Sequence, residues 1–232
     1  MTETILQNVA AVRQRIADAA WQAGRDPAEI RLVAVTKYVD AAAARQLIAA
    51  GLTDLGESRP QQLWAKADAL ENEHVQWHFV GSLQRNKVRR TIEIATLIHS
   101  LDSQRLADAL HQEAESLGRT VGVLLEVNIS GDASKHGVAP EAAAALLDHA
   151  ARLPHLQIRG LMTMSHREGG PDVARRDFAR LRELRDQLLF AAPENVDLGE
   201  LSMGMSDDFE QAILEGATIV RIGSAFFEGI VS

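Results

Sequence analysis

The chain has 232 residues, 46% of them hydrophobic and 24% charged, which suffices for one globular domain with a substantial core. Its net charge is −8 and no Lys/Arg run exceeds two residues, which argues against a nucleic-acid or anionic-membrane surface. Cysteine is absent, so disulfides, thiolate nucleophiles and Cys-based zinc sites are excluded. No apolar stretch approaches the ~20 residues of a membrane span, and the first residues are too polar for a signal peptide. We expect a cytoplasmic protein with a small polar ligand.

The first predicted element is a helix. Ile5, Val9, Val12, Ile16 and Ala20 recur at steps of three and four, the period of an amphipathic helix with one buried stripe. Eight short apolar runs follow, separated by helical stretches, and each run is a candidate strand. These runs are 32–36, 53–56, 76–81, 96–101, 122–129, 157–164, 199–204 and 218–223.

Helix boundaries are predicted from capping residues. Asp40 is placed to cap a helix over 41–50, and Gly51 to end it. The spacing of Ser58 and Gln61 predicts a capping box, and Asp207 and Glu210 repeat it.

Apolar strands alternating with helices predict a parallel sheet covered by helices. Eight such units favour an α/β fold of the (β/α)8 TIM barrel type, with an extra N-terminal helix. No linker or low-complexity tract divides the chain, so we expect a single domain over 1–232, with 166–172 as a loop between strand and helix.

Ligand sites in such barrels lie at the carboxyl ends of the strands, which nominates Lys37. A lysine whose stem lies in the barrel mouth would be desolvated, and its uncharged amine could form a Schiff base with a carbonyl. The alternative is a lysine that extends from the strand end to solvent.

The last two strands are followed by 202–208 and 221–224, the usual phosphate position in these barrels. Their glycines, hydroxyls and free N–H groups suit an anion, although each segment alone is also an ordinary turn. Together with Lys37 they predict a ligand that carries both an aldehyde and a phosphate. Arg221, inside an apolar run, could face a pyridine nitrogen or instead bridge Glu126 or Glu200.

Seven ordered motifs extend nearly from end to end and resemble the pyridoxal phosphate homeostasis proteins, a family similar to the N-terminal barrel of alanine racemase. The motifs are LVAVTK (32–37), GESR (56–59), WHFVG with LQRNK (77–87), VNIS (127–130), GLMTM (160–164), LSMGMSD (201–207) and RIG (221–223).

The resemblance implies that the chain binds pyridoxal 5′-phosphate as a Schiff base with Lys37 and takes part in vitamin B6 and amino-acid homeostasis. It also implies that Ser206, Gly223 and Ser224 bind the phosphate and that Arg221 faces the pyridine nitrogen. Positions at strand ends complete the candidate cofactor set with Ser58, Asn128, Met162, Ser165, Ser202 and Met205.

The sequence departs from the family at four places. Ser58 replaces a common Asn, Ser82 a His or Pro, and Ser224 a Thr, and the usual ending Phe-Gly-Ala-Arg is altered at 227–230. Ser58 and Ser82 put the polar contacts at the edge of the ring in doubt, whereas Ser224 keeps its hydroxyl.

Two function classes remain open. A carrier is favoured because Tyr38, the single tyrosine, should point to the opposite side of a strand from Lys37, and no room for a second catalytic domain is expected after Ser224. The alternative is a pyridoxal-phosphate-dependent racemase or aldolase with His78, Ser165 or His166 as its base.

Packing in the core is the competing interpretation of His78. The histidines show no metal-binding spacing, and the cluster Arg85, Lys87, Arg89 and Arg90 is interpreted as a solvated helix face. We expect a monomer, with apo-enzymes that use the cofactor as candidate partners.

Overall fold

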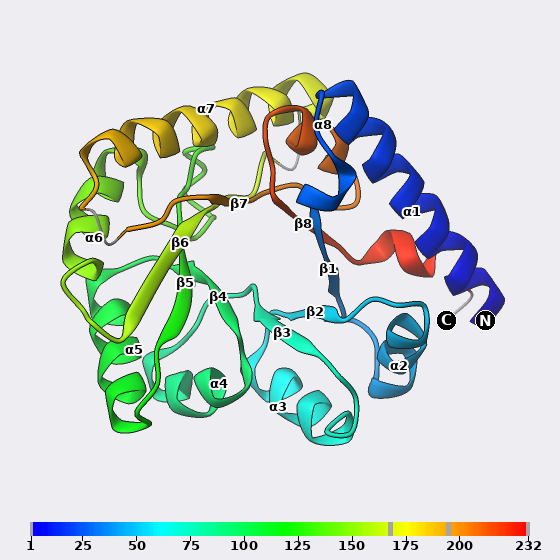
Figure 1. Ribbon diagram of the computed structural model, residues 1–232, viewed down its shortest axis with the longest axis horizontal. Helices are drawn as coiled ribbons and strands as arrows, with labels where there is room; N and C mark the ends of the chain where they lie inside the picture. The colour runs from blue at the N-terminus through cyan, green and yellow to red at the C-terminus, as the bar shows by residue number, and fades with distance from the viewer. Residues whose placement is uncertain (1, 167–168, 194–195, 231–232) are drawn as a thin grey trace.

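The computed structural model describes residues 2–166, 169–193 and 196–230. Eight parallel strands in sequence order form a closed barrel, and helices surround it (Figure 1). The predicted TIM barrel with an extra N-terminal helix is therefore confirmed, and all eight predicted strands are present. The strands are β1 (Arg31–Val35), β2 (Asp54–Glu57), β3 (Gln76–Phe79), β4 (Leu97–Leu101), β5 (Val121–Glu126), β6 (Leu156–Met162), β7 (Glu200–Ser202) and β8 (Ile219–Ile222).

The predicted N-terminal helix is α1 (Thr2–Gln22), which lies outside the barrel beside α8 (Figure 1). Its buried stripe contains all five residues that define its period. Arg15 of α1 forms an ion pair with Glu210 of α8 at 2.6 Å. The other helices are α2 (Ala41–Ala49), α3 (Pro60–Ala69), α4 (Val88–Ile94), α5 (Gln104–Ser116), α6 (Ala143–Ala150), α7 (Gly170–Ala191) and α8 (Phe209–Leu214).

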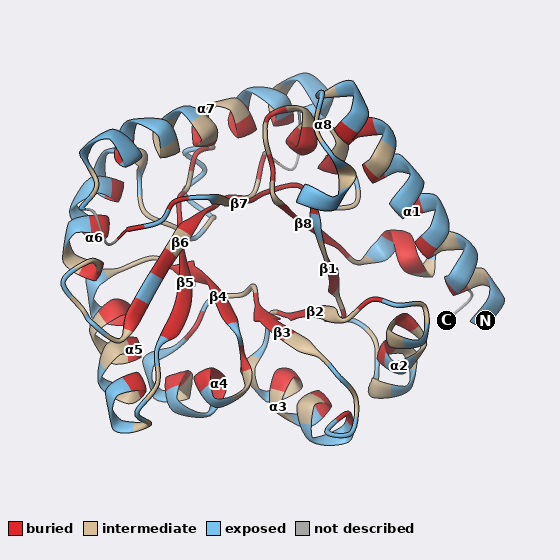
Figure 2. Ribbon diagram, viewed as in Figure 1, coloured by how far each residue is buried: buried red, intermediate tan, exposed pale blue. Residues whose placement is uncertain are grey.

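Two apolar layers stabilise the fold. The larger lies between the strands and the inward faces of the helices, whose outer faces are exposed (Figure 2). A separate cluster is formed by one residue from each of five strands, as expected for side chains that fill the barrel interior. These residues are Val33, Leu97, Leu124, Met162 and Ile219.

Parallel pairing of β1 with β8 closes the barrel, with Ala34 opposite Ile222. This register brings the loop after β1 next to the loop after β8. Lys37 and Gly223, far apart in sequence, therefore lie in loops that follow neighbouring strands.

The caps predicted for α2 are confirmed. The side chain of Asp40 accepts a hydrogen bond from Ala43 N at 2.8 Å. Gly51 has φ +78°, and the amide of Leu52 donates to Leu47 O at 3.0 Å, which is the pairing of a Schellman motif.

Both predicted capping boxes are wrong. Pro60 occupies the first turn of α3, so Arg59, and not Ser58, is its N-cap. Helix α8 has Asp208 as its N-cap instead of Asp207. Asp208 is one residue closer to the helix, and one of its carboxylate oxygens accepts from Met205 N.

No helix in the described ranges is long and apolar enough to cross a membrane. Among the same residues, no group of three or more His, Asp or Glu side chains is arranged to hold a metal ion.

Candidate functional site

The carboxyl ends of β7, β8 and β1 lie side by side at the barrel mouth. The amide of Gly223 donates to Ser206 Oγ at 3.3 Å, which joins the two predicted phosphate segments. A Cβ on Gly223 would lie 3.0 Å from the carbonyl oxygen of Val35, so glycine permits this close approach. The structure therefore brings the predicted phosphate residues next to the strand that precedes Lys37.

Lys37 is exposed, and the expected desolvation of its amine is wrong for this structure. Strand β1 ends at Val35, and the amide of Val39 donates to Thr36 O at 3.1 Å, so Lys37 lies in a turn. Its Nζ atom is 4.8 Å from the centre of the Tyr38 ring, and Tyr38 is 83% exposed. The expectation that the two side chains point to opposite sides is therefore also wrong, because they do not belong to a strand.

A second lysine, Lys66 of α3, is buried at the base of the same loops. It forms an ion pair with Glu57 and donates to Thr36 O at 2.6 Å. Thr36 Oγ1 also donates to Glu57 Oε1 at 2.8 Å. This network was not predicted from the sequence. The available signal was a lysine in the helical stripe that contains Leu63 and Leu70.

Ser58, a predicted cofactor contact, is half-buried after β2 and lies against the loop after β3. A Cβ on Gly81 would lie only 2.1 Å from Ser58 O. Residue 81 must therefore be glycine, and the two loops are held together by their backbones.

Arg221 is another buried cation at the mouth, with only 5% of its surface exposed. Nη1 donates to Ser202 Oγ at 2.6 Å and Nη2 donates to Thr163 O at 2.9 Å. In the described part of the chain no carboxylate forms an ion pair with it, so the predicted alternative of a bridge to Glu126 or Glu200 is wrong. Three of the five guanidinium N–H groups have no described partner.

Burial lowers the pKa of Arg221 to about 10, although Asp208 and Glu126 oppose this shift. The guanidinium is therefore charged at neutral pH. A buried charge without a direct counterion is costly unless a ligand or a network compensates it.

Glu126, at the end of β5, is a further buried ionisable group. Burial raises its pKa to about 7, the charge of Asp102 adds to the increase, and Arg221 opposes it. The carboxyl group is consequently half-protonated near neutral pH.

The predicted phosphate segment 202–208 also contains two carboxylates, those of Asp207 and Asp208. Asp208 accepts from Met205 N at 2.6 Å and from Ser165 Oγ, so both of these predicted residues hold Asp208 in place. Met205 is 38% exposed, and Ser224 is exposed at the first position of the short helix η4 (Ser224–Phe227).

Two further predicted residues have their side chains engaged elsewhere. Asn128 donates from Nδ2 to Asp132 O at 2.9 Å, and its Oδ1 accepts from Ser130 Oγ and Gly131 N, so its amide organises its own loop. Met162 is buried in the cluster inside the barrel.

Neither candidate histidine base is free. His78 is buried, with one ring nitrogen 2.9 Å from His99 and the other 3.1 Å from Asp54. His166, at the start of the predicted 166–172 loop, is 2.8 Å from Asp177. Residues 167–168 of that loop lie outside the described residues, and its predicted end is wrong because 170–172 belong to α7.

The basic cluster has the geometry of a solvated helix surface. Arg89 pairs with Glu113 and Arg90 with Asp68, at 3.1 Å and 3.0 Å. Lys87 lies 5.7 Å from the centre of the Trp64 ring.

The closed barrel and the arrangement of its mouth define a class of protein. The family described as alanine racemase, N-terminal domain, matches residues 5–229. The alanine racemase of Clostridium difficile has the same fold, with a TM-score of 0.75 at 14% identity over 99% of this chain and 57% of that one.

Full-length relatives define the family more narrowly. The pyridoxal phosphate homeostasis protein of Pseudomonas aeruginosa is 45% identical over 224 residues, which is 97% of this chain and 95% of the relative. That of Aquifex aeolicus is 41% identical over 221 residues, 95% of this chain and 96% of the relative. The structure of PipY from Synechococcus elongatus with pyridoxal phosphate bound has a TM-score of 0.85 at 35% identity, over 96% of this chain and 99% of that one. The chain belongs to the pyridoxal phosphate homeostasis protein family.

Proposed function

We propose that this chain, as one domain over 1–232, binds pyridoxal 5′-phosphate at the carboxyl end of its barrel and contributes to vitamin B6 and amino-acid homeostasis. The names of its relatives and the pyridoxal phosphate bound to PipY support this. The observation that carries the proposal within this chain is Arg221, a buried cation with unused donors and no described counterion. A pyridine nitrogen offers the acceptor that such a group lacks.

The residues at the mouth fit the rest of the cofactor. Ser206 follows β7, and Gly223 and Ser224 follow β8, the strand next to β1 and the lysine loop; we propose that their hydroxyl and backbone N–H groups bind the phosphate, with the Gly223 N–H donating to Ser206 Oγ in the present structure. Asp208 lies close to this position, but its described hydrogen bonds bind both of its oxygens to Met205 and Ser165. These bonds hold the carboxylate in a fixed place.

Lys37 is the amine that we assign to the aldehyde. The bound cofactor would supply a carbonyl carbon, with which a lysine amine condenses to a Schiff base with loss of water. The chain has four lysines. Lys66 is occupied by its ion pair, and Lys87 lies against Trp64 on the outside. Lys135 is the competing candidate, because its Nζ lies at the mouth, 2.5 Å from Ser165 O.

Trapping the adduct tests the assignment. Borohydride reduction of the loaded protein should attach a phosphopyridoxyl mass to the peptide that contains Lys37, and Lys37→Ala should abolish both the adduct and the yellow colour. Lys135→Ala is the matched control and should retain both. An adduct on Lys135, or the absence of any binding of added cofactor, would overturn the assignment.

The phosphate position is tested separately. Ser206→Ala and Ser224→Ala should weaken the affinity for pyridoxal phosphate far more than that for pyridoxal, since only the former has the ester. Equal losses for both ligands would contradict the assigned position.

One observation favours a second candidate function, a racemase or aldolase. The Tyr38 ring lies against the Lys37 amine, so a phenol capable of proton transfer is next to the proposed attachment point. Steady turnover of an amino acid above ~1 per second, abolished by Tyr38→Phe, would establish this function over the carrier role.

For the carrier, we propose a cytoplasmic monomer that passes the cofactor to apo-enzymes. Transfer from the loaded protein to an apo-enzyme should be faster than release into buffer. Equal rates would indicate storage without directed delivery.

A further inference from the structure

A continuous chain of polar side chains runs through the barrel interior from Arg221 to the opposite opening. Ser202 Oγ, which accepts from Arg221, is 2.8 Å from His99 Nδ1. His99 Nε2 is 2.9 Å from His78 Nδ1, and His78 Nε2 is 3.1 Å from Asp54 Oδ1. We call these five residues the relay. They belong to β8, β7, β4, β3 and β2.

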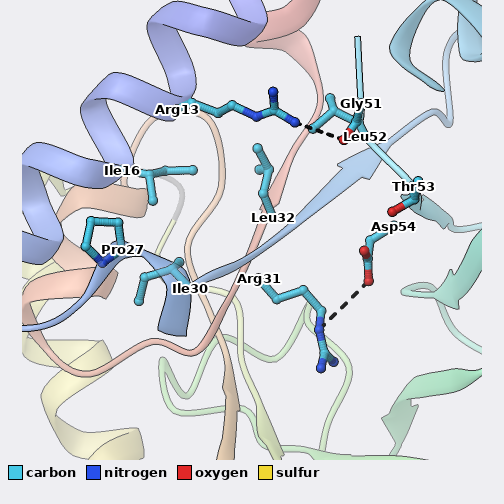
Figure 3. A pocket seen from close by; sticks show the side chains of 10 residues that line it. All are labelled: Arg13, Ile16, Pro27, Ile30, Arg31, Leu32, Gly51, Leu52, Thr53 and Asp54. Atoms are coloured by element: carbon cyan, nitrogen blue, oxygen red, sulfur yellow. Dashed lines mark hydrogen bonds and ion pairs between the residues drawn. The ribbon is translucent and has the colours of Figure 1, made fainter. Parts of the chain in front are cut away.

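The relay ends in contact with solvent. Asp54 begins β2 at the amino end of the barrel, and its side chain is 26% exposed. It borders a cavity of about 350 Å³ together with Arg31 and Leu32 (Figure 3). The members between Asp54 and Arg221 are buried, and His99 and Ser202 are completely so.

Only one arrangement of hydrogens gives every polar hydrogen of Ser202, His99 and His78 an acceptor within the relay. Ser202 accepts from Arg221, and its single hydroxyl hydrogen has only His99 Nδ1 to receive it. His99 Nε2–H then donates to His78 Nδ1, and His78 Nε2–H donates to the Asp54 carboxylate. Both histidines are consequently neutral and carry their hydrogen on Nε2.

The electrostatic environment agrees with a neutral His99. Burial lowers its pKa well below the usual value, and the guanidinium charges of Arg221 and Arg31 act in the same direction. At Asp54, burial alone would raise the pKa, but the hydrogen bond from His78 and the charge of Arg31 lower it overall. A carboxylate is therefore retained at the outer end.

We propose that Asp54, His78, His99 and Ser202 are positioning residues that fix Arg221 through four oriented hydrogen bonds. The relay joins a buried cation to a carboxylate on the other side of the barrel. It thus compensates the charge of Arg221 without a direct counterion and leaves the remaining guanidinium donors available to a ligand. That this ligand is the pyridine ring rests on the proposed function.

Histidine tautomers in the cofactor-free protein provide the first test. Long-range ¹H–¹⁵N spectra distinguish a protonated Nδ1 from a protonated Nε2, and they require no cofactor. The expected result is a protonated Nε2 on both His78 and His99. A protonated Nδ1 on either ring, or a cationic His99 at neutral pH, would overturn the relay.

Two matched variants test whether the relay is continuous. Asp54 and Glu200 each pair with Arg31, at 3.8 Å and 3.2 Å, but only Asp54 accepts from His78. In Asp54→Leu the tautomers of both histidines should redistribute, including His99, which Asp54 does not touch. Glu200→Leu should leave them unchanged. Unchanged His99 signals in Asp54→Leu, or equal changes in both variants, would contradict the proposal.

A second measurement links the relay to Arg221. The affinity of Asp54→Leu for pyridoxal phosphate should be about tenfold lower than that of the wild type, whereas the affinity of Glu200→Leu should differ from it by no more than about twofold. Equal retention by all three proteins would overturn the positioning role. If the wild type binds no cofactor, the proposed function fails, while the tautomer result still decides whether the relay exists.

Discussion

Two sides of the barrel mouth handle buried charge differently. Beside β1 and β2, Lys66 forms an ion pair with Glu57, and Thr36 donates a hydrogen bond to the same carboxylate. Beside β7 and β8, Arg221 has a hydroxyl and a carbonyl as its described partners. On the first side the charge of Lys66 is paired with a carboxylate of the protein. On the second side some guanidinium N–H groups of Arg221 have no described acceptor. We therefore expect changes on the first side to affect folding and, under the proposed function, changes on the second side to affect ligand binding.

The largest expected effect comes from breaking the paired side. Lys66→Met leaves Glu57 buried without its cation, which should lower the free energy of unfolding by about 3–5 kcal/mol. Chemical denaturation measures this loss. The double variant Lys66→Met/Glu57→Leu removes both charges and should recover most of it. A single variant as stable as the wild type would show that the pair does not stabilise the fold.

The next effect concerns Glu126, whose folded-state pKa is about 7 against an ordinary value of 4.5. A raised pKa means that the folded state holds the proton more tightly, so this contribution to stability is complete below pH ~4.5 and is lost as pH rises through ~7. Glutamine does not titrate, so Glu126→Gln should not show this loss. Its free energy of unfolding should exceed that of the wild type by on the order of 3 kcal/mol above pH 7 and should equal it at pH 4.

Urea denaturation across this pH range measures the effect of Glu126→Gln. The exposed Glu141→Gln serves as the control and should follow the wild type at every pH. A pH-independent difference between wild type and Glu126→Gln would contradict the assigned titration.

The unpaired side should respond in binding more than in folding. Arg221→Met removes a buried charge that lacks a direct counterion, so the free energy of unfolding should change by only about 1 kcal/mol. Retention of pyridoxal phosphate should fall about tenfold or more, since a hydrogen-bonding cation is lost. Equilibrium dialysis measures the retention. If Arg221→Met lowers the free energy of unfolding as much as Lys66→Met does, the distinction between the two sides is wrong.

The smallest effect tests the loop that carries Lys37. Asp40→Ala removes the α2 cap directly after this loop and should cost about 1 kcal/mol. Asp26→Ala removes a comparable bond, to Ala28 N at 2.9 Å, far from the lysine. Both variants should lose stability in denaturation experiments, but only Asp40→Ala should slow cofactor capture. Equal capture rates would show that the cap does not order the loop.

The sequence predicted the strands and the order of the barrel because each strand is a short apolar run between recognisable turns. It also predicted the cap at Asp40 and the proximity of the segments that contain Ser206 and Gly223. These features depend on local pattern or on the general geometry of barrels.

The wrong predictions concern positions where a shift of a strand or helix boundary by one residue changes the environment of a side chain. Ending β1 at Val35 converts Lys37 and Tyr38 from strand neighbours into turn residues, and Pro60 shifts the cap of α3 by one position. The relay could not be predicted, since the contact of His78 with His99 depends on the pairing of β3 with β4. Lys66 was missed because its partner belongs to a different element.

The relay also constrains how the polypeptide can fold. His99 and Ser202 are 103 residues apart, and Arg221 joins them only when β8 pairs with β7. Until β7 takes its place in the barrel, the imidazole of His99 has no hydroxyl partner and must either remain hydrated or be buried at a penalty. The final assembly step should therefore expel water from the centre of the barrel. Contacts of such long sequence separation are slow to form, and so the interior should order later than the outer helices.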